Sequence, residues 1–212
     1  MDKVLLILVD GMRPDSIAAC GSEYADNMLK NCRYKDMQAK TVFPSVTLPC
    51  HMSLFHSVVP QRHGILTNTF VPMARPVDGL IEKLHNAGKR CAFYYTWEQL
   101  RDLAKPGMLD CSLCSAIFHG QGIKADRTVT DAAIAAMAAE KPMSCFRLYF
   151  TIGLPTHCSS GATHNHLAMV GAISSMLMGS PGNSSGAPCS GIITGIVMSS
   201  GASLPWFMSC PP

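Results

Sequence analysis

The chain has 212 residues, enough for one domain with a hydrophobic core, or for one domain and a fragment. Hydrophobic residues make up 48% of it, charged residues only 15%, and the formal net charge is +3. Globular chains usually carry about a quarter charged residues, so the low fraction needs a local explanation. No run of Lys or Arg occurs, which excludes the charge pattern of a nucleic-acid-binding surface. We therefore expect no nucleic-acid polymer among its partners.

The first residues do not have the pattern of a targeting segment. Only six apolar residues, Val4–Val9, precede Asp10, too few for a signal peptide or a membrane span. The apolar-rich stretch 167–178 is also too short to cross a bilayer. The ten Cys are scattered and no secretory signal accompanies them, so they are interpreted as reduced thiols. We expect a cytoplasmic protein with no membrane partner.

In chain order, the first predicted element is a strand over Lys3–Val9. This nearly continuous aliphatic run is typical of a parallel strand that is buried on both faces. Pro14 suits the first turn of a following helix that reaches about Cys20. A second strand is expected over Asp36–Val42, ending before Pro44.

The remaining segments up to residue 140 continue the alternation of strands and helices. Their hydrophobic periods predict helices over Thr47–Ser57, Val77–Ala87 and Asp126–Glu140, and strands over Cys91–Tyr95 and Phe146–Ile152. Such alternation predicts an α/β fold in which a parallel sheet is covered by helices on both faces. In such sheets the functional groups gather at the carboxyl ends of the strands.

Asp10 is the first candidate site residue, because it directly follows the first predicted strand. A carboxylate beside buried apolar surface needs a partner, which is a cation, a helix N-terminus or a metal ion. An equally simple interpretation is that Asp10 caps the next helix.

Thr47 is the second candidate, in a segment flanked by Pro44 and Pro49 at the start of a predicted helix. Unpaired N–H groups and the helix dipole favour an anion there, such as a phosphoryl group. A hydroxyl in this place becomes a nucleophile if a bound metal ion lowers its pKa. The alternative is an ordinary N-cap threonine.

Two motifs resemble one known family. Residues 4–15, VLLILVDGMRPD, resemble the opening strand of type I phosphodiesterases and nucleotide pyrophosphatases, a branch of the alkaline phosphatase superfamily. Residues 41–68, TVFPSVTLPCHMSLFHSVVPQRHGILTN, resemble the family's nucleophile segment, with Thr-x-Pro opening a helix and Pro-x-x-His-Gly-Ile followed by Asn. Both motifs occur in the family's order and at its distance. The resemblance covers about residues 3–140 and weakens after residue 100.

The resemblance implies specific roles. Asp10 would be a ligand of one zinc-type ion, and Thr47 would be the nucleophile whose oxygen touches the same ion. The Asn68 amide would donate to a phosphoryl oxygen, although a plain turn residue is the alternative. Tyr95 and Trp97 lie near where relatives place aromatic residues beside the leaving group, and a core role is the alternative for both. Family members often have Asn where this chain has Cys50, a weaker hydrogen-bond donor, so Cys50 is only a weak substrate contact.

The chain changes character after residue 140. All 14 acidic residues lie at or before Glu140, and residues 141–212 are rich in Ser, Gly, Met, Cys and Pro. Three interpretations stay open: a segment translated out of frame after a shift near residues 143–146, a flexible low-complexity tail, or a divergent domain. We divide the chain into the N-terminal part of an alkaline phosphatase-like domain, residues 1–140, incomplete toward the C-terminus, and an acid-free tail, 141–212.

The tail bears directly on the expected activity. The family completes a two-metal site with a later Asp-x-x-x-His and an Asp-His-Gly motif, but no Asp follows Asp131. A complete relative would hold two Zn and cleave phosphodiesters or nucleotide pyrophosphates through a phospho-threonine. This chain is expected to bind zinc poorly and to be inactive or impaired. The alternatives are a non-catalytic binding module or fragment of such an enzyme, and a phosphomonoesterase or phosphonate hydrolase of the same superfamily. Its expected partner is a small phosphoester substrate.

Overall fold

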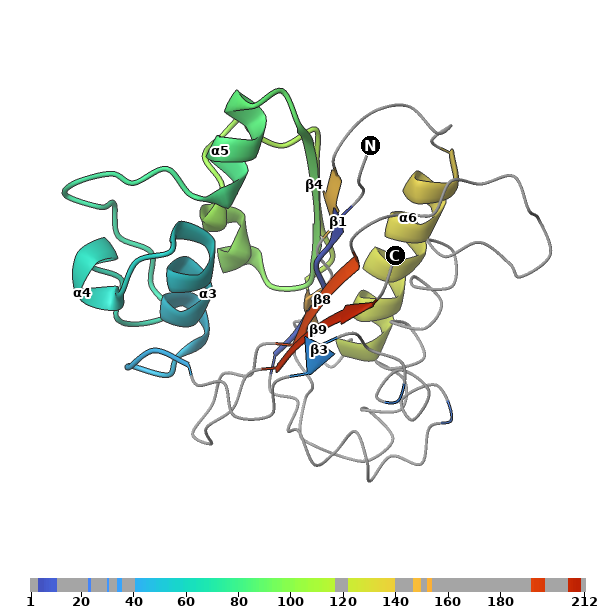
Figure 1. Ribbon diagram of the computed structural model, residues 1–212, viewed down its shortest axis with the longest axis horizontal. Coiled ribbons are helices and arrows are strands. Elements are labelled where there is room, and N and C mark those ends of the chain that lie inside the picture. Colours follow the sequence, from blue (N-terminus) through green and yellow to red (C-terminus); the bar gives the residue numbers. More distant parts are fainter. Residues whose placement is uncertain are drawn as a thin grey trace.

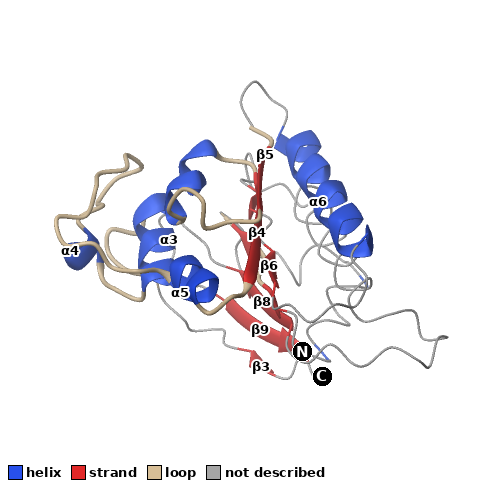
Figure 2. Ribbon diagram, turned by 90° about the horizontal axis from the view of Figure 1, so that it is seen from above, coloured by secondary structure: helices blue, strands red, loops and turns tan. Residues whose placement is uncertain are grey.

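The computed structural model describes residues 4–10, 23, 30, 34–35, 41–116, 122–139, 147–149, 152–153, 192–196 and 206–210. The elements form layers around a central sheet (Figures 1 and 2). The helices α3 (Thr47–His56), α4 (Pro60–His63) and α5 (Leu80–Asn86) lie on one side, and α6 (Gly122–Ala139) lies on the other. Helices on both faces of a sheet are the predicted α/β arrangement.

Two pairs of parallel strands join the start of the chain to residues 148–153 of the later part, at the described positions 148–149 and 152–153. β1 (Val4–Leu5) pairs with β6 (Arg147–Tyr149), and β2 (Leu8–Val9) pairs with β7 (Ile152–Gly153). The residue offset between partners is the same in both pairs, so β1 and β2 face β6 and β7 in the same register. The predicted strand over residues 3–9 is confirmed as this two-part strand.

Two further strands extend the sheet. β4 (Arg90–Tyr95) pairs in parallel with β6 on one side and with β5 (Cys111–Cys114) on the other. The order is therefore β1-β6-β4-β5, and every pair is parallel. A 3-10 helix, η1 (Glu98–Leu103), follows β4 and packs against α3. Parallel strands need long crossovers, which α3, α5 and α6 supply.

The core lies mainly between the sheet and α3. In β4, Cys91, Phe93 and Tyr95 alternate onto one face, and they join Leu48, Met52 and Phe55 of α3 in one buried cluster. The rings of Phe55 and Phe93 meet edge to face, with centroids 5.7 Å apart. On α6, Ala125, Val129 and Ala133 are buried at a spacing of four, so small side chains form the stripe of this helix that faces inward.

The Pro-x-x-His-Gly-Ile run, residues 60–65, forms a short segment that packs against α3. Pro60 occupies the first position of α4, and Gly64 ends that helix with φ of 76°, a conformation that suits glycine. The buried His63 accepts from the N–H of Ile65 at 3.1 Å, so its other nitrogen carries the proton and donates to Ser53 Oγ at 3.0 Å. Pro60, His63 and Gly64 of this run therefore have structural roles.

Glu82 ties two loops together at the start of α5. Its carboxylate is 1% exposed and accepts from the N–H of Gly79 and from the N–H of Lys105, both at 2.8 Å. A Cβ at Gly79 would lie 2.9 Å from the same carboxylate, so any larger residue would require this side chain to shift. Because Glu82 caps the helix here, α5 begins at Leu80, three residues after the start predicted from the apolar spacing.

A second, antiparallel sheet was not predicted. β3 (Tyr34–Lys35) pairs with β9 (Trp206–Cys210), which pairs with β8 (Ile192–Ile196). The predicted strand over Asp36–Val42 is wrong at its end, because residues 41–42 have no strand structure and lead into the turn before α3. Residues 36–40 and the predicted helix 14–20 lie outside the described residues.

Four of the described strands come from the acid-free part of the chain; β6 falls within the strand predicted over Phe146–Ile152, and β7 extends one residue beyond it, to Gly153. The predicted α3 and β4 are confirmed to within one residue, and α6 begins four residues earlier than expected. None of the described helices is long and apolar enough to cross a membrane.

We predict that Glu82→Gln lowers the free energy of unfolding by about 2–3 kcal/mol, because an NH2 group would face a buried backbone N–H that now has a charged acceptor. Urea denaturation followed by circular dichroism measures the change. Glu98→Gln is the matched control: this side chain is 63% exposed and pairs with Arg101 at 3.2 Å, so the variant should differ from the wild type by less than about 0.5 kcal/mol. Equal losses in the two variants would contradict the role of Glu82.

Candidate active site

The structure brings Asp10 and Thr47 together. Asp10 follows β2 directly and is 1% exposed, and Thr47 is the first residue of α3. The Thr47 hydroxyl donates to Asp10 Oδ2 at 3.0 Å, although the residues are 37 positions apart in the chain. The two candidates predicted from separate motifs thus form one polar pair, at the carboxyl end of a buried strand and the N-terminus of a helix.

Local sequence explains why α3 begins at Thr47. Val46 is extended, with φ of −111° and ψ of 149°, and its carbonyl accepts the Cys50 N–H at 3.1 Å. Pro49 falls in the first turn, where its missing N–H costs no hydrogen bond. No side chain caps Val46, so the first N–H groups of the helix need other acceptors.

Asn68 supplies one of these acceptors. Its Oδ1 accepts the backbone N–H of Leu48 at 3.0 Å, from a loop 20 residues further along the chain. The acceptor must be the oxygen, because Leu48 contributes the hydrogen, and so the amide is held with its Nδ2–H2 group as the remaining donor. Asn68 is exposed. The side chain is thus more than a turn residue: it lies beside Thr47 at the helix N-terminus.

His51 is the site residue that the motif analysis left without a role. Its ring is fully buried, and its Nδ1–H donates to the Thr47 carbonyl at 2.7 Å. Its Nε2 has no hydrogen-bond partner among the described residues. Burial lowers the pKa of His51, and the nearby Asp10 charge offsets this only in part, so the ring is neutral at pH 7. The spacing of four from Thr47, which puts both on one helix face, was the available signal.

Cys50 points into the protein. It is 4% exposed, and its thiol lies 3.9 Å from the Pro44 carbonyl oxygen. Burial, and next the Asp10 charge, raise the pKa of the Cys50 thiol to about 11. The group therefore stays a protonated thiol at neutral pH and is a poor nucleophile.

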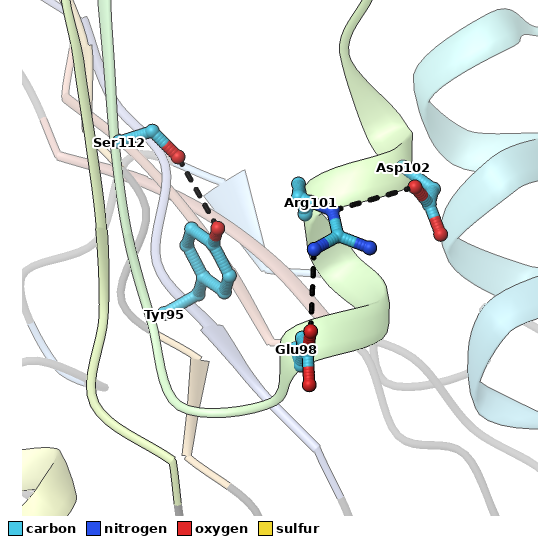
Figure 3. Close-up of polar contacts among 5 residues, drawn as sticks. All are labelled: Tyr95, Glu98, Arg101, Asp102 and Ser112. Atoms are coloured by element: carbon cyan, nitrogen blue, oxygen red, sulfur yellow. Dashed lines mark hydrogen bonds and ion pairs between the residues drawn. The ribbon is translucent and has the colours of Figure 1, made fainter.

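Tyr95 and Trp97 both lie in the core cluster. Tyr95 is 4% and Trp97 8% exposed. The Tyr95 hydroxyl lies 3.2 Å from Ser112 Oγ on the neighbouring strand (Figure 3). In the same view, Arg101 of η1 contacts Glu98 and Asp102, at 3.2 and 3.7 Å. Both aromatic side chains therefore lie in the hydrophobic core, together with Leu100 and Leu103 of η1.

The Asp10–Thr47 pair fits a divalent cation in part. Metal–oxygen distances of about 2.0–2.2 Å place two oxygens of a tetrahedral shell about 3.3 Å apart, close to the 3.0 Å observed here. Among the described residues, however, no group of three or more His, Cys, Asp or Glu side chains is placed to hold a metal ion. Asp10 and Thr47 supply two ligands, where a zinc ion usually takes at least three from protein.

A separate cavity of about 360 Å³ lies beyond the other end of α3. Met52 and His56 of α3, Phe70 and Met73 of the following loop, and Leu103 line it, together with other side chains. None of its lining residues belongs to the Asp10, Thr47 and Asn68 group.

The fold is similar to solved structures that all exceed this chain in length. A 2-O GAG sulfatase superposes with a TM-score of 0.74 at 9% identity, over 100% of this chain and 64% of the sulfatase. Murine ectonucleotide pyrophosphatase/phosphodiesterase 5, in an inactive threonine-to-alanine variant bound to AMP, gives 0.68 at 16%, over 95% of this chain and 57% of that one. The C-terminal periplasmic domain of EcEptC from Escherichia coli, in complex with Zn, gives 0.69 at 8%, over 99% and 72%.

These relatives have the alkaline phosphatase-like fold, and the chain spans about 60% of the length of the first two. A search of curated protein sequences finds no match. The family model of type I phosphodiesterase/nucleotide pyrophosphatase matches residues 4–97, which include Asp10, Thr47 and Asn68. The strand, the helix and the loop that build the site thus all lie in the segment that matches the model of the type I phosphodiesterase/nucleotide pyrophosphatase family.

Proposed function

We propose that the chain is a metal-dependent phosphoric ester hydrolase that cleaves phosphodiesters or nucleotide pyrophosphates, with Thr47 as the nucleophile. The observation that carries the proposal is the 3.0 Å contact between the Thr47 hydroxyl and the Asp10 carboxylate at a helix N-terminus. A hydroxyl with a carboxylate acceptor is held for deprotonation, and a helix N-terminus favours the anionic group that it attacks.

The chemistry follows from the positions of the three side chains. Thr47 Oγ1 attacks phosphorus, the bond from phosphorus to the leaving oxygen breaks, and a phospho-threonine remains, which water hydrolyses. A divalent ion held by Asp10 and Thr47 would lower the pKa of the hydroxyl. The Asn68 Nδ2–H2 group and the N-terminus of α3 would stabilise the charge on the phosphoryl oxygens.

A small nucleotide phosphoester is the substrate class that we favour. The murine relative binds AMP, and residues 4–97 of this chain match the model of the type I phosphodiesterase/nucleotide pyrophosphatase family. The similarity to a sulfatase and to a phosphonate monoester hydrolase concerns the fold alone. A phosphomonoesterase or phosphonate hydrolase therefore stays a second enzymatic alternative, which the choice of substrate tests.

One observation favours a non-catalytic alternative. The described residues offer only Asp10 and Thr47 as a metal-ligand pair, and no cluster of three acidic, His or Cys side chains. A site of this kind retains the helix N-terminus and Asn68, which bind an anion without turning it over. A phosphate-binding module derived from the enzyme is the candidate of a different class.

We predict that the 212-residue chain binds clearly fewer than two zinc ions and hydrolyses bis(p-nitrophenyl) phosphate slowly, because two ligands are too few for a stable zinc site. Elemental analysis after gel filtration and a chromogenic assay measure both quantities. Thr47→Ala and Asp10→Asn should abolish the remaining turnover, and p-nitrophenyl phosphate should be the poorer substrate.

Thr128→Ala is the matched control. Thr128 is an exposed residue of α6, and its hydroxyl donates to the Lys124 carbonyl at 2.9 Å, so this variant should keep the wild-type rate. Turnover that survives Thr47→Ala would contradict the proposed nucleophile. AMP binding that depends on Thr47 and Asp10, without any turnover, would support the non-catalytic module.

Cys50 gives a separate prediction, because its thiol pKa is raised to about 11. Iodoacetamide should label Cys50 far more slowly than the exposed Cys111 at pH 8, and its rate should rise steeply only toward pH 11. The pKa of Cys50 in the folded protein lies above the ordinary value of 9.0. The contribution of this thiol to the free energy of unfolding is therefore fully present below pH 9 and is lost as the pH rises toward 11. Peptide mass spectrometry resolves the two sites. Labelling of Cys50 as fast as Cys111 at pH 8 would show that the thiol is accessible.

A further inference from the structure

The peptide unit between Thr47 and Leu48 is bonded by side chains at both of its ends. Its carbonyl accepts the Nδ1–H of His51 at 2.7 Å, and its N–H donates to Oδ1 of Asn68 at 3.0 Å. This is the peptide that directly follows the candidate nucleophile. Its orientation therefore depends on two side chains, one from a turn later in the same helix and one from a loop.

The hydrogen bonds of this group run in one direction. The imidazole donates to the peptide carbonyl, the peptide N–H donates to the Asn68 carbonyl, and the Asn68 amide is left with two N–H donors. Each member is a planar, conjugated group that passes polarisation from its acceptor end to its donor end. Consecutive bonds of this kind strengthen one another by roughly 10–30% each.

Burying the His51 ring costs free energy, so a histidine at this position needs a compensating contact. The ring is fully buried, and its Nε2 has no partner in the described part of the chain, so the ring loses hydration there. An apolar side chain would fill the same space without that cost. The hydrogen bond from Nδ1 to the Thr47 carbonyl is the contact that distinguishes histidine from an apolar residue at this position.

We propose that His51 is a positioning residue: through the Thr47–Leu48 peptide it aligns and polarises Asn68, so that the Asn68 amide donates to an oxygen of a bound phosphoryl anion. His51 itself touches neither the anion nor Thr47 Oγ1. The identity of the anion rests on the proposed function, whereas the chain of hydrogen bonds does not.

Two matched variants isolate the donor. His51→Asn and His51→Leu have side chains of nearly the same shape, but only asparagine can donate to the Thr47 carbonyl. In His51→Leu, the Leu48 amide proton should move upfield and exchange with solvent about tenfold faster, as expected when one hydrogen bond of the series is lost. His51→Asn should recover most of the wild-type shift and protection. Two variants with the same Leu48 signal would overturn the proposal.

An NMR titration with inorganic phosphate in the presence of zinc tests whether the Asn68 amide binds the anion. His51→Leu should weaken the phosphate Kd by about tenfold, and His51→Asn should restore it to within about threefold. In an Asn68→Ala background, His51→Leu should have no further effect, because the connection is already broken. Additive losses in the double variant would overturn the proposal.

The two measurements separate this inference from the proposed function. If the wild type binds no phosphate, the proposed function fails, while the Leu48 amide still decides whether His51 acts through the peptide. If His51→Leu does not fold, long-range ¹H–¹⁵N spectra of the wild type give the tautomer instead. A proton on Nδ1 of His51 supports the proposal, and a proton on Nε2 alone overturns it.

Discussion

The fold depends on one strand that is buried on both faces. Residues 5–9 are all 8% exposed or less, and Leu5, Leu8 and Val9 pair in parallel with Tyr149, Ile152 and Gly153 at one residue offset. A strand with no exposed face cannot present a polar side chain along its length, so its first polar group appears where it ends. That group is Asp10, and its carboxylate is placed by the burial of the hydrophobic residues before it.

The N-terminus of α3 provides the complementary half of the site. Its first turn contains Thr47, the N–H group that Asn68 accepts and the carbonyl that His51 contacts. A helix start leaves backbone donors without partners inside the helix. The loop that carries Asn68 satisfies one of them with a side chain whose Nδ2–H2 group keeps two donors of its own.

Residues 60–65 show that a sequence motif can have a structural role. His63 and Gly64 are part of the motif, but His63 is buried against Ser53 and Gly64 ends α4. They precede the loop that carries Asn68, whose Oδ1 accepts the N–H of Leu48. Burial and the partner of each ring nitrogen distinguish the two kinds of histidine in this segment.

The sequence by itself determined the alternation of strands and helices, the parallel central sheet, and the candidates Asp10, Thr47 and Asn68, because these follow from local apolar periods, proline positions and short motifs. Only the tertiary structure decided the antiparallel pairing of Tyr34–Lys35 with Trp206–Cys210, the capping of α5 by Glu82, and the contacts of His51. It also placed Cys50, Tyr95 and Trp97 in buried positions. The physical reason is that pairing partners, burial and the proton on a ring nitrogen depend on residues far apart in the chain, whereas propensity and periodicity act only over one or two turns.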